Sequence, residues 1–331
     1  IEKVWYVRYG HKGDPVFVYL GNIKSATIGH GLIVNDYSNM IDYPDKRHVG
    51  MQFDVDLGKI GIETLITDVN QTPLLGGRIF FRPFHNSGLF FLKRLALGFS
   101  AATDQNPDQY SGTRDDGVTV VGVDLDLPVI RSSVLEILAF TDMAQMEVGK
   151  AYRDKVKNHG RGYTAGLKGT VLKYIGYRGE YRIIENNFIP GYFDTYYEVD
   201  RASRPYTLGN TSKPLKRGPY MELTFSFLEK IGLLFTYEDY NLDPAGYYPY
   251  LRGTVTISPE LLLNRFTLGV SYAKRNVKDV EDFFTARRAL MTTELGYNIA
   301  PQVQLVIVQR QTFDAKGVPS KNTTMETRIQ F

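Results

Sequence analysis

The chain has 331 residues, 43% of them hydrophobic, and a net charge of +3 from 39 basic and 36 acidic side chains. This hydrophobic content excludes a disordered chain, and the near balance of charge gives no case for nucleic-acid binding. The absence of cysteine excludes disulfides and thiol chemistry, and no apolar run approaches the roughly 20 residues of a membrane-spanning helix.

Alternation of apolar and polar residues predicts β-strands from one end of the chain to the other. In the stretch 48–58, for example, Met51, Phe53 and Val55 alternate with Gln52 and Asp54. The predicted strands, in chain order, are 3–9, 15–22, 48–58, 60–69, 77–85, 91–102, 117–127, 131–142, 160–171, 173–184, 219–229, 231–240, 249–257, 265–276, 287–298, 302–312 and 322–331. A further strand at Ala26–Val34 would raise the number to about 18, and exclusion of the first segment would lower it to about 16.

The predicted connections alternate between short and long. The short ones are at 58–59, 127–128, 172–173, 229–230 and 300–301, and the long ones at 104–117, 143–159, 185–218, 240–248 and 276–285. Tight turns at one end and long loops at the other are typical of a transmembrane, antiparallel, up-and-down β-barrel. A large soluble β-sandwich is the alternative, because it also favours tyrosine and phenylalanine. We expect one barrel domain over residues 1–331, with a removed leader or missing residues before Ile1.

The C-terminal stretch NTTMETRIQF resembles the last strand of Gram-negative outer-membrane proteins. Met325, Ile329 and the terminal Phe331 are apolar and alternate with polar residues. The resemblance implies that these three residues are the assembly signal read by the barrel-assembly machinery, with the outer-membrane bilayer and its lipopolysaccharide as surroundings. The layout is similar to porins in general, without matching a named porin family. The stretch YLGNIKSATIGHGLIVNDYSN resembles a porin strand followed by an inward-folded segment.

Charged residues on the polar face of the predicted strands are expected to line the pore, because charge facing lipid is costly. These pore-lining candidates are Asp54, Asp56, Glu63, Arg78, Arg82, Arg94, Asp124, Asp126, Lys168, Arg178, Arg182, Glu222, Glu238, Arg252, Arg265 and Arg328. They form either the walls of an open water-filled pore or a set of ion pairs that closes the interior. About 16–18 strands favour the open pore.

The longest loop, Glu185–Asn210, is rich in aromatic and charged residues. Long loops are often functional, so this loop is expected to narrow the pore or to dock a protein partner or a second copy of the chain. The residues expected to do so are Phe188, Tyr192, Phe193, Tyr196, Tyr197, Asp200 and Arg201.

A calcium-loop spacing occurs at Asp104, Asn106, Asp108 and Asp115, but Gln109 occupies the position where such loops need glycine. A solvated loop without metal is therefore expected, and nothing in the sequence calls for a cofactor.

No histidine lies in a nucleophile or metalloprotease motif, so the chain is not expected to be an enzyme. We expect a channel for passive diffusion of small hydrophilic solutes across the outer membrane. The alternative is a closed barrel that docks other proteins through its loops or periplasmic face.

Overall fold

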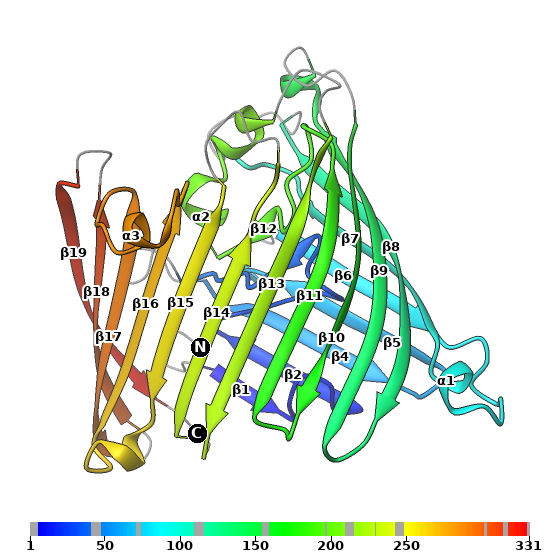
Figure 1. Ribbon diagram of the computed structural model, residues 1–331, viewed down its shortest axis with the longest axis horizontal. Coiled ribbons are helices and arrows are strands. Elements are labelled where there is room, and N and C mark those ends of the chain that lie inside the picture. The colour runs from blue at the N-terminus through cyan, green and yellow to red at the C-terminus, as the bar shows by residue number, and fades with distance from the viewer. Residues whose placement is uncertain are drawn as a thin grey trace. The chain divides into compact units, whose positions relative to one another are not determined.

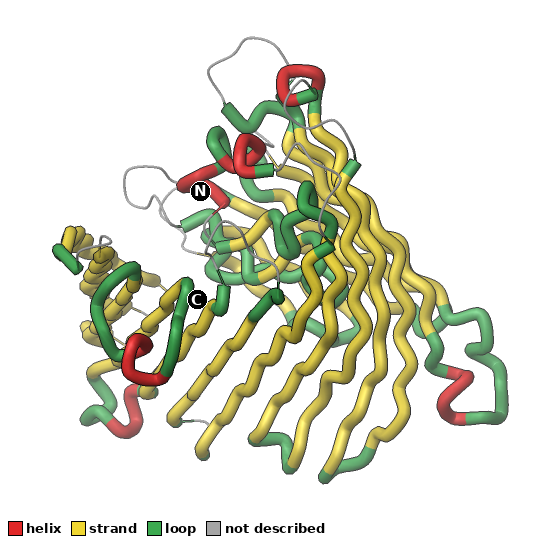
Figure 2. Tube along the Cα trace, turned by 45° about the horizontal axis from the view of Figure 1, so that its top comes forward, coloured by secondary structure: helices red, strands yellow, loops and turns green. Residues whose placement is uncertain are grey.

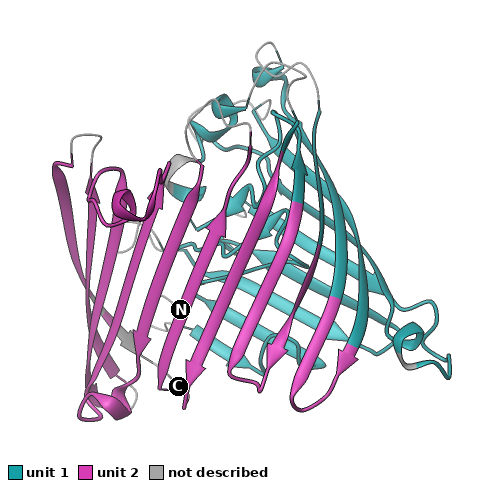
Figure 3. Ribbon diagram, viewed as in Figure 1, with its two compact units in different colours: residues 1–129, 139–165, 182–216 teal, residues 130–138, 166–181, 217–331 magenta. Residues whose placement is uncertain are grey.

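The computed structural model divides the chain into two compact units (Figure 3). Unit 1 comprises residues 1–129, 139–165 and 182–216, and unit 2 comprises residues 130–138, 166–181 and 217–331. The residues described are 6–40, 48–70, 74–108, 116–153, 159–195, 197–208, 215–228, 230–241, 248–300, 303–313 and 317–329.

Almost all regular structure is β (Figure 1). The strands up to the middle of the chain are β1 (Tyr6–Tyr9), β2 (Val16–Gly21), β3 (Val34–Asn35), β4 (Gly50–Asp56), β5 (Ile60–Ile66), β6 (Leu74–Phe81), β7 (Ala96–Asp104), β8 (Val118–Arg131), β9 (Leu135–Val148) and β10 (Gly160–Val171). They are followed by β11 (Ile175–Ile184), β12 (Phe193–Asp194), β13 (Lys216–Phe227), β14 (Ile231–Glu238), β15 (Tyr250–Ile257), β16 (Phe266–Arg275), β17 (Ala289–Ala300), β18 (Val303–Phe313) and β19 (Pro319–Ile329).

The described helices are single turns within connections (Figure 2). They are α1 (Phe90–Lys93), η1 (Lys150–Tyr152), α2 (Tyr197–Asp200), η2 (Arg204–Thr207), η3 (Pro259–Leu261) and α3 (Val280–Phe283). No helix among the described residues is long and apolar enough to cross a membrane.

Seventeen strands belong to one sheet, and β3 pairs in parallel with β12 in a separate two-stranded sheet. Strands that follow one another in the chain pair antiparallel, as in the runs from β4 to β8 and from β13 to β19. The predicted all-β, antiparallel, up-and-down fold is therefore confirmed, and every one of the seventeen predicted strands has a counterpart.

The predicted additional strand at Ala26–Val34 is wrong. Residues 22–40, which we call the covering segment, leave the large sheet after β2 and contribute only the two residues of β3 to a strand. The helix α1 likewise delays the start of β7 to Ala96, so that Arg94 lies at the C-terminal end of a helix rather than on a strand.

The two faces of the large sheet differ in polarity, and we call them the polar and the apolar face. In unit 1, Ile79 and Val123 are each 52% exposed, whereas their neighbours Arg78 and Asp124 are 5% and 7% exposed. In unit 2, Phe235 is 45% exposed beside Thr236 at 6%. Large apolar side chains thus point outwards between buried polar ones, which is the reverse of a soluble β-sandwich.

Candidate functional site: the covered polar face of unit 1

The covering segment packs on the polar face within unit 1, and its apolar side chains are buried. Ile23, Ile28, Leu32, Val34 and Tyr37 all lie among the most buried residues of the chain. The covering segment therefore shields part of the polar face of unit 1 from solvent.

A tight bend in the covering segment directs His30 towards the sheet. Gly29 and Gly31 have φ angles of 58° and 82°, a conformation that residues with a side chain rarely adopt. The backbone N–H of Gly29 donates to Glu63 at 3.2 Å, which fixes the bend to β5.

Glycines on the strands provide the space for the covering segment. A Cβ atom at Gly50 would lie 2.4 Å from Ile23, and one at Gly76 would lie 2.8 Å from Ile28. At Gly122 it would lie 3.0 Å from Ile33. Glycine inside a strand is unfavourable and often marks a place where another part of the chain approaches closely. These three glycines leave the space that the covering segment fills.

Arg78 on β6 is the centre of a buried network of ion pairs. Its guanidinium binds Asp124 on β8 through two nitrogens, one of them at 2.9 Å, and reaches Asp126 at 3.0 Å. It also binds Glu63 on β5 at 3.0 Å and lies over the Phe80 ring. Buried charges need such partners, because an unpaired one is strongly destabilising.

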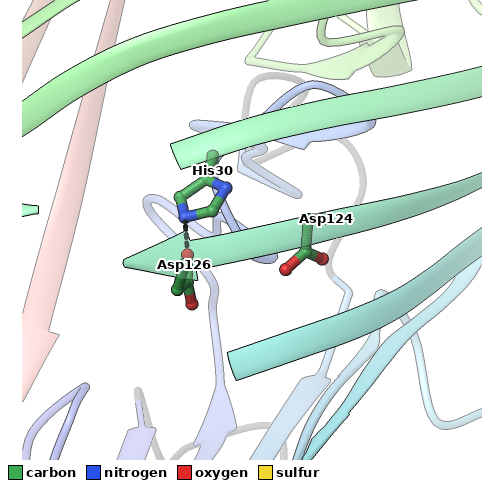
Figure 4. A group of neighbouring side chains, drawn as sticks. All are labelled: His30, Asp124 and Asp126. Atoms are coloured by element: carbon green, nitrogen blue, oxygen red, sulfur yellow. Dashed lines mark ion pairs between the residues drawn. The ribbon is translucent and has the colours of Figure 1, made fainter. Parts of the chain in front are cut away.

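His30 joins this network from the covering segment (Figure 4). Its Nε2 lies 2.5 Å from Asp126 on β8, and its Nδ1 lies 2.8 Å from Asp142 on β9. The ring also stacks on Phe140 at 4.3 Å between centroids. An imidazole donates through both nitrogens only when it is positively charged, and two carboxylates are suitable partners for that form.

Lys12 extends the network at its other end. Its Nζ lies 2.7 Å from Asp54 on β4 and 3.1 Å from Glu63 on β5. Basic side chains from the first hairpin, the covering segment and β6 therefore meet acidic side chains of β4, β5, β8 and β9. The arrangement ties the covering segment to the strands electrostatically.

One subset of these residues has the spacing of a metal site. His30, Asp124 and Asp126 each offer an atom, and these atoms lie within 4.8 Å of one another. Arg78 already contacts both carboxylates, including both oxygens of Asp124. The site is consequently arranged for ion pairing, and a metal ion would have to displace the guanidinium.

Residues 185–208, which we call the aromatic loop, lie on the covering segment. The N–H groups of Gly191 and Phe193 donate to Leu32 and Ile33 of that segment at 2.8 and 3.2 Å. Phe193 is paired with Val34 in the two-stranded sheet. The aromatic loop thus folds inwards within unit 1, on top of the covering segment.

The rings of the aromatic loop form one buried cluster. Phe193 and Tyr197 are 4.9 Å apart, and Tyr192 lies 5.1 Å from Phe193. Arg201 and Tyr197 both donate to the Asp104 carboxylate of β7, at 2.6 and 2.8 Å. These contacts anchor the loop to the large sheet.

Of the remaining residues expected to act in the loop, only Phe188 has a described side chain. Phe188 is buried against Gly162, where a Cβ atom would lie 2.4 Å from its ring. Asp200 ends α2, but its side chain, like the whole of Tyr196, lies outside the described residues.

The other pore-lining candidates are spread over both units. Asp56 and Arg82 form a two-point ion pair at 2.7 and 2.8 Å in unit 1. In unit 2, Arg178 binds Glu180 and lies over the Tyr220 ring, whose hydroxyl donates to Glu222 at 3.0 Å. The further candidates are Lys168 and Arg252, half-buried on strands, Arg182, buried, and Glu238, which accepts from Tyr240.

Arg265 is exposed in the turn before β16 rather than placed on a strand. Met325 is exposed on β19, and Ile329 ends that strand. The side chains of Arg328 and Ile329, and the whole of Phe331, lie outside the described residues.

The alternation pattern missed three members of the network, namely Lys12, His30 and Asp142. Lys12 lies in a turn and His30 in the covering segment, so neither belongs to a strand whose face can be assigned. Asp142 sits within β9, which extends to Val148 rather than ending at 142. The sequence Gly-His-Gly at 29–31 was the available signal for His30.

Comparison with known proteins gives one structural similarity to report. CdiB from Acinetobacter baumannii aligns with a TM-score of 0.42 and 10% sequence identity, over 96% of this chain and 57% of CdiB. The chain thus spans little more than half the length of that protein. No protein-family profile and no curated protein matches the sequence.

Proposed function

We propose that this chain is an outer-membrane β-barrel channel for small hydrophilic solutes, and that the covering segment restricts passage through it. The observation that carries the proposal is the reversed polarity of the sheet, with exposed Ile79, Val123 and Phe235 beside buried polar neighbours. In water such a surface would associate, whereas acyl chains stabilise it.

The covered polar face supports a restricted channel rather than a permanently open one. Arg78, His30 and Lys12 pair with the acidic side chains of four strands, and the aromatic loop closes over the covering segment. Wall charges engaged in ion pairs leave less free charge to attract a passing solute. Movement of the covering segment would be needed to expose them.

A second function is favoured by the same packing. If the covering segment never moves, the chain is a closed barrel that docks protein partners through its loops. We propose no enzymatic role in either case, because no histidine of the sequence lies in a nucleophile or metalloprotease motif.

Conductance through planar lipid bilayers tests the proposal. Wild-type protein folded in detergent is expected to give rare, small current steps. A variant lacking residues 24–38 is expected to give frequent and larger steps, because the polar face is then open to water. If this deletion prevents folding, Arg78→Gln provides the same comparison through a weakened network.

Two results would contradict the channel. Absence of current from folded wild type and from both variants would favour the closed docking barrel. A monodisperse, soluble particle without detergent would rule out both membrane proposals, since the apolar face would then be tolerated in water.

A further inference from the structure

The connection between β16 and β17, which carries α3, folds back over the apolar face within unit 2 (Figure 1). Tyr272 lies on this face of β16, because it stands four residues from Leu268, which is paired with the exposed Leu295. The Tyr272 hydroxyl lies 2.8 and 2.9 Å from the carbonyl oxygens of Phe283 and Thr285, either of which can accept its proton. The connection is therefore held on the side of the sheet that we assign to lipid.

Lys274, on the same face of β16, fixes the connection more firmly. Its Nζ donates to the Asp282 carboxylate at 3.0 Å and to the hydroxyl and carbonyl oxygens of Thr285 at 2.7 and 3.1 Å. The Asp279 carboxylate in turn accepts from the Asp282 N–H at 2.7 Å and caps α3. The shape of the connection is thus set by hydrogen bonds, and the side chains that it leaves exposed keep defined positions.

Two large apolar side chains of this connection are almost fully exposed. Val280 is 77% exposed and Phe284 is 79% exposed. They are four residues apart around one helical turn, so they lie on the same side of α3. Neighbouring apolar side chains exposed to this degree mark a contact surface.

Basic side chains flank this apolar pair. Lys278, Arg287 and Arg288 are exposed before and after α3. The exposed acidic side chains of the connection are Asp279, which caps α3, and Glu281. The surface of the connection therefore carries an excess of positive charge.

The basic surface continues to the neighbouring connection and to β19. A Cβ atom at Gly317 would lie 3.6 Å from the Arg287 side chain, which places Arg287 beside the β18–β19 connection. Lys321 is exposed on β19. One row of paired residues crosses four strands on this face, namely Tyr272, Met291, Gln311 and Lys321. With adjacent strands about 4.8 Å apart, the row is about 14 Å wide.

We propose that the exposed surface of the β16–β17 connection, together with Lys321, binds lipopolysaccharide of the outer leaflet. This inference rests on the proposed outer-membrane location. Val280 and Phe284 contact acyl chains, and Lys278, Arg287 and Arg288 bind phosphate groups, as clusters of basic residues at a membrane surface do.

The position of the connection and its charge favour this ligand. The connection joins β16 and β17 at the end opposite to the tight turn between β17 and β18, and the end with the long connections faces the exterior in outer-membrane barrels. A second copy of the chain seated on the same patch would bring like charges together, because a two-fold interface pairs a patch with itself. A phosphorylated lipid with several acyl chains meets both the apolar and the basic side chains.

Titration of purified lipopolysaccharide into detergent-folded protein, followed by microscale thermophoresis, tests this surface. We expect saturable binding to the wild type. Removal of the phosphates from the lipopolysaccharide should weaken binding about tenfold or more, because charge-assisted hydrogen bonds to phosphate are among the strong ones. Arg287→Gln combined with Arg288→Gln should have a similar effect, and Phe284→Ser should weaken binding through lost apolar contact.

Two control variants match these changes elsewhere in the chain. Lys59→Gln combined with Lys173→Gln removes two charges that are exposed in tight turns. Leu263→Ser removes an apolar side chain that is 83% exposed in the turn before β16. Both controls should bind lipopolysaccharide as the wild type does.

Equal affinity of the wild type and the double arginine variant would overturn the proposal. So would equal affinity for intact and dephosphorylated lipopolysaccharide, or equally strong binding of phosphatidylglycerol, which would assign the surface to anionic phospholipid in general. A dimer in detergent that Phe284→Ser dissociates would assign it to a second copy of the chain. Conductance is measured separately, so lost lipid binding with retained current rejects this site alone, whereas a soluble particle without detergent rejects the membrane location as well.

Discussion

Arg78 and Arg82 lie close together in the chain but in different electrical surroundings. Arg78 is buried among carboxylates of β5 and β8. Arg82 forms its ion pair with Asp56, and both of those side chains are partly exposed. Water screens the Arg82 pair more strongly than the Arg78 network, so the two arginines offer a direct comparison of a largely buried and a more accessible ion pair.

Replacing Arg78 with glutamine should therefore cost much more stability than replacing Arg82. Arg78→Gln leaves buried carboxylates without their partner, and we expect a loss of about 3–5 kcal/mol in the free energy of unfolding. Arg82→Gln should cost about 1 kcal/mol or less. Urea unfolding in lipid vesicles measures both, and equal costs would show that the Arg78 network is not buried.

Lys274 on β16 is another buried charge, 1% exposed, and it holds a connection in place. Its Nζ binds the Asp282 carboxylate at 3.0 Å and the Thr285 hydroxyl at 2.7 Å. This hydrogen bond from Lys274 lowers the pKa of Asp282 below its usual range.

The Asp282 contact should be sensitive to acid. A carboxyl whose pKa is lowered by folding stabilises the folded state above its ordinary pKa of about 3.9, and this contribution is lost as the pH falls through the folded-state value. We expect residues 277–285 to gain amide hydrogen exchange below about pH 4. Asp282→Asn should remove this pH dependence, whereas Glu281→Gln should retain it; the reverse result would contradict the assignment.

At the level of the element, period-two alternation predicted the strands and failed at the covering segment. Alternation indicates which side chains are buried, but a segment forms a strand only if its backbone also pairs with a neighbouring strand. Ala26, Ile28 and His30 alternate as a strand would, yet Gly29 and Gly31 bend the chain away from extended geometry. The ion pairs of His30 and Lys12 join segments far apart in sequence, so no local pattern could have placed them.

The glycines beneath the covering segment provide a test of how firmly it is seated. Gly76→Leu would put its side chain where Ile28 now lies, and overpacking of this kind typically costs about 1–3 kcal/mol. We expect faster hydrogen exchange in residues 22–40 and more frequent current steps. Gly253→Leu is the control, because nothing lies within 4 Å of a Cβ atom there. Unchanged exchange in Gly76→Leu would mean that the segment is held by other contacts.

At the level of the whole molecule, both compact units have the same reversal of polarity. Leu233, Phe235 and Leu295 in unit 2 are exposed as Ile79 and Val123 are in unit 1. Composition and alternation could not distinguish a membrane barrel from a soluble β-sandwich, because strands of both alternate apolar and polar residues. The distinction depends on which face is covered, and that is a property of the folded chain.

A single charge on the apolar face of β18 distinguishes lipid from water as the surrounding medium. Ile307, near the middle of that strand, is exposed, so Ile307→Arg in a soluble protein would change stability little. In a bilayer we expect a loss of about 2–4 kcal/mol, because arginine would lie near the midplane. Gln311→Arg, on the same face near the strand end, should cost about 1 kcal/mol or less. Unfolding titrations of both variants in lipid vesicles measure the difference, and equal small costs would remove the apolar face as an argument for the membrane.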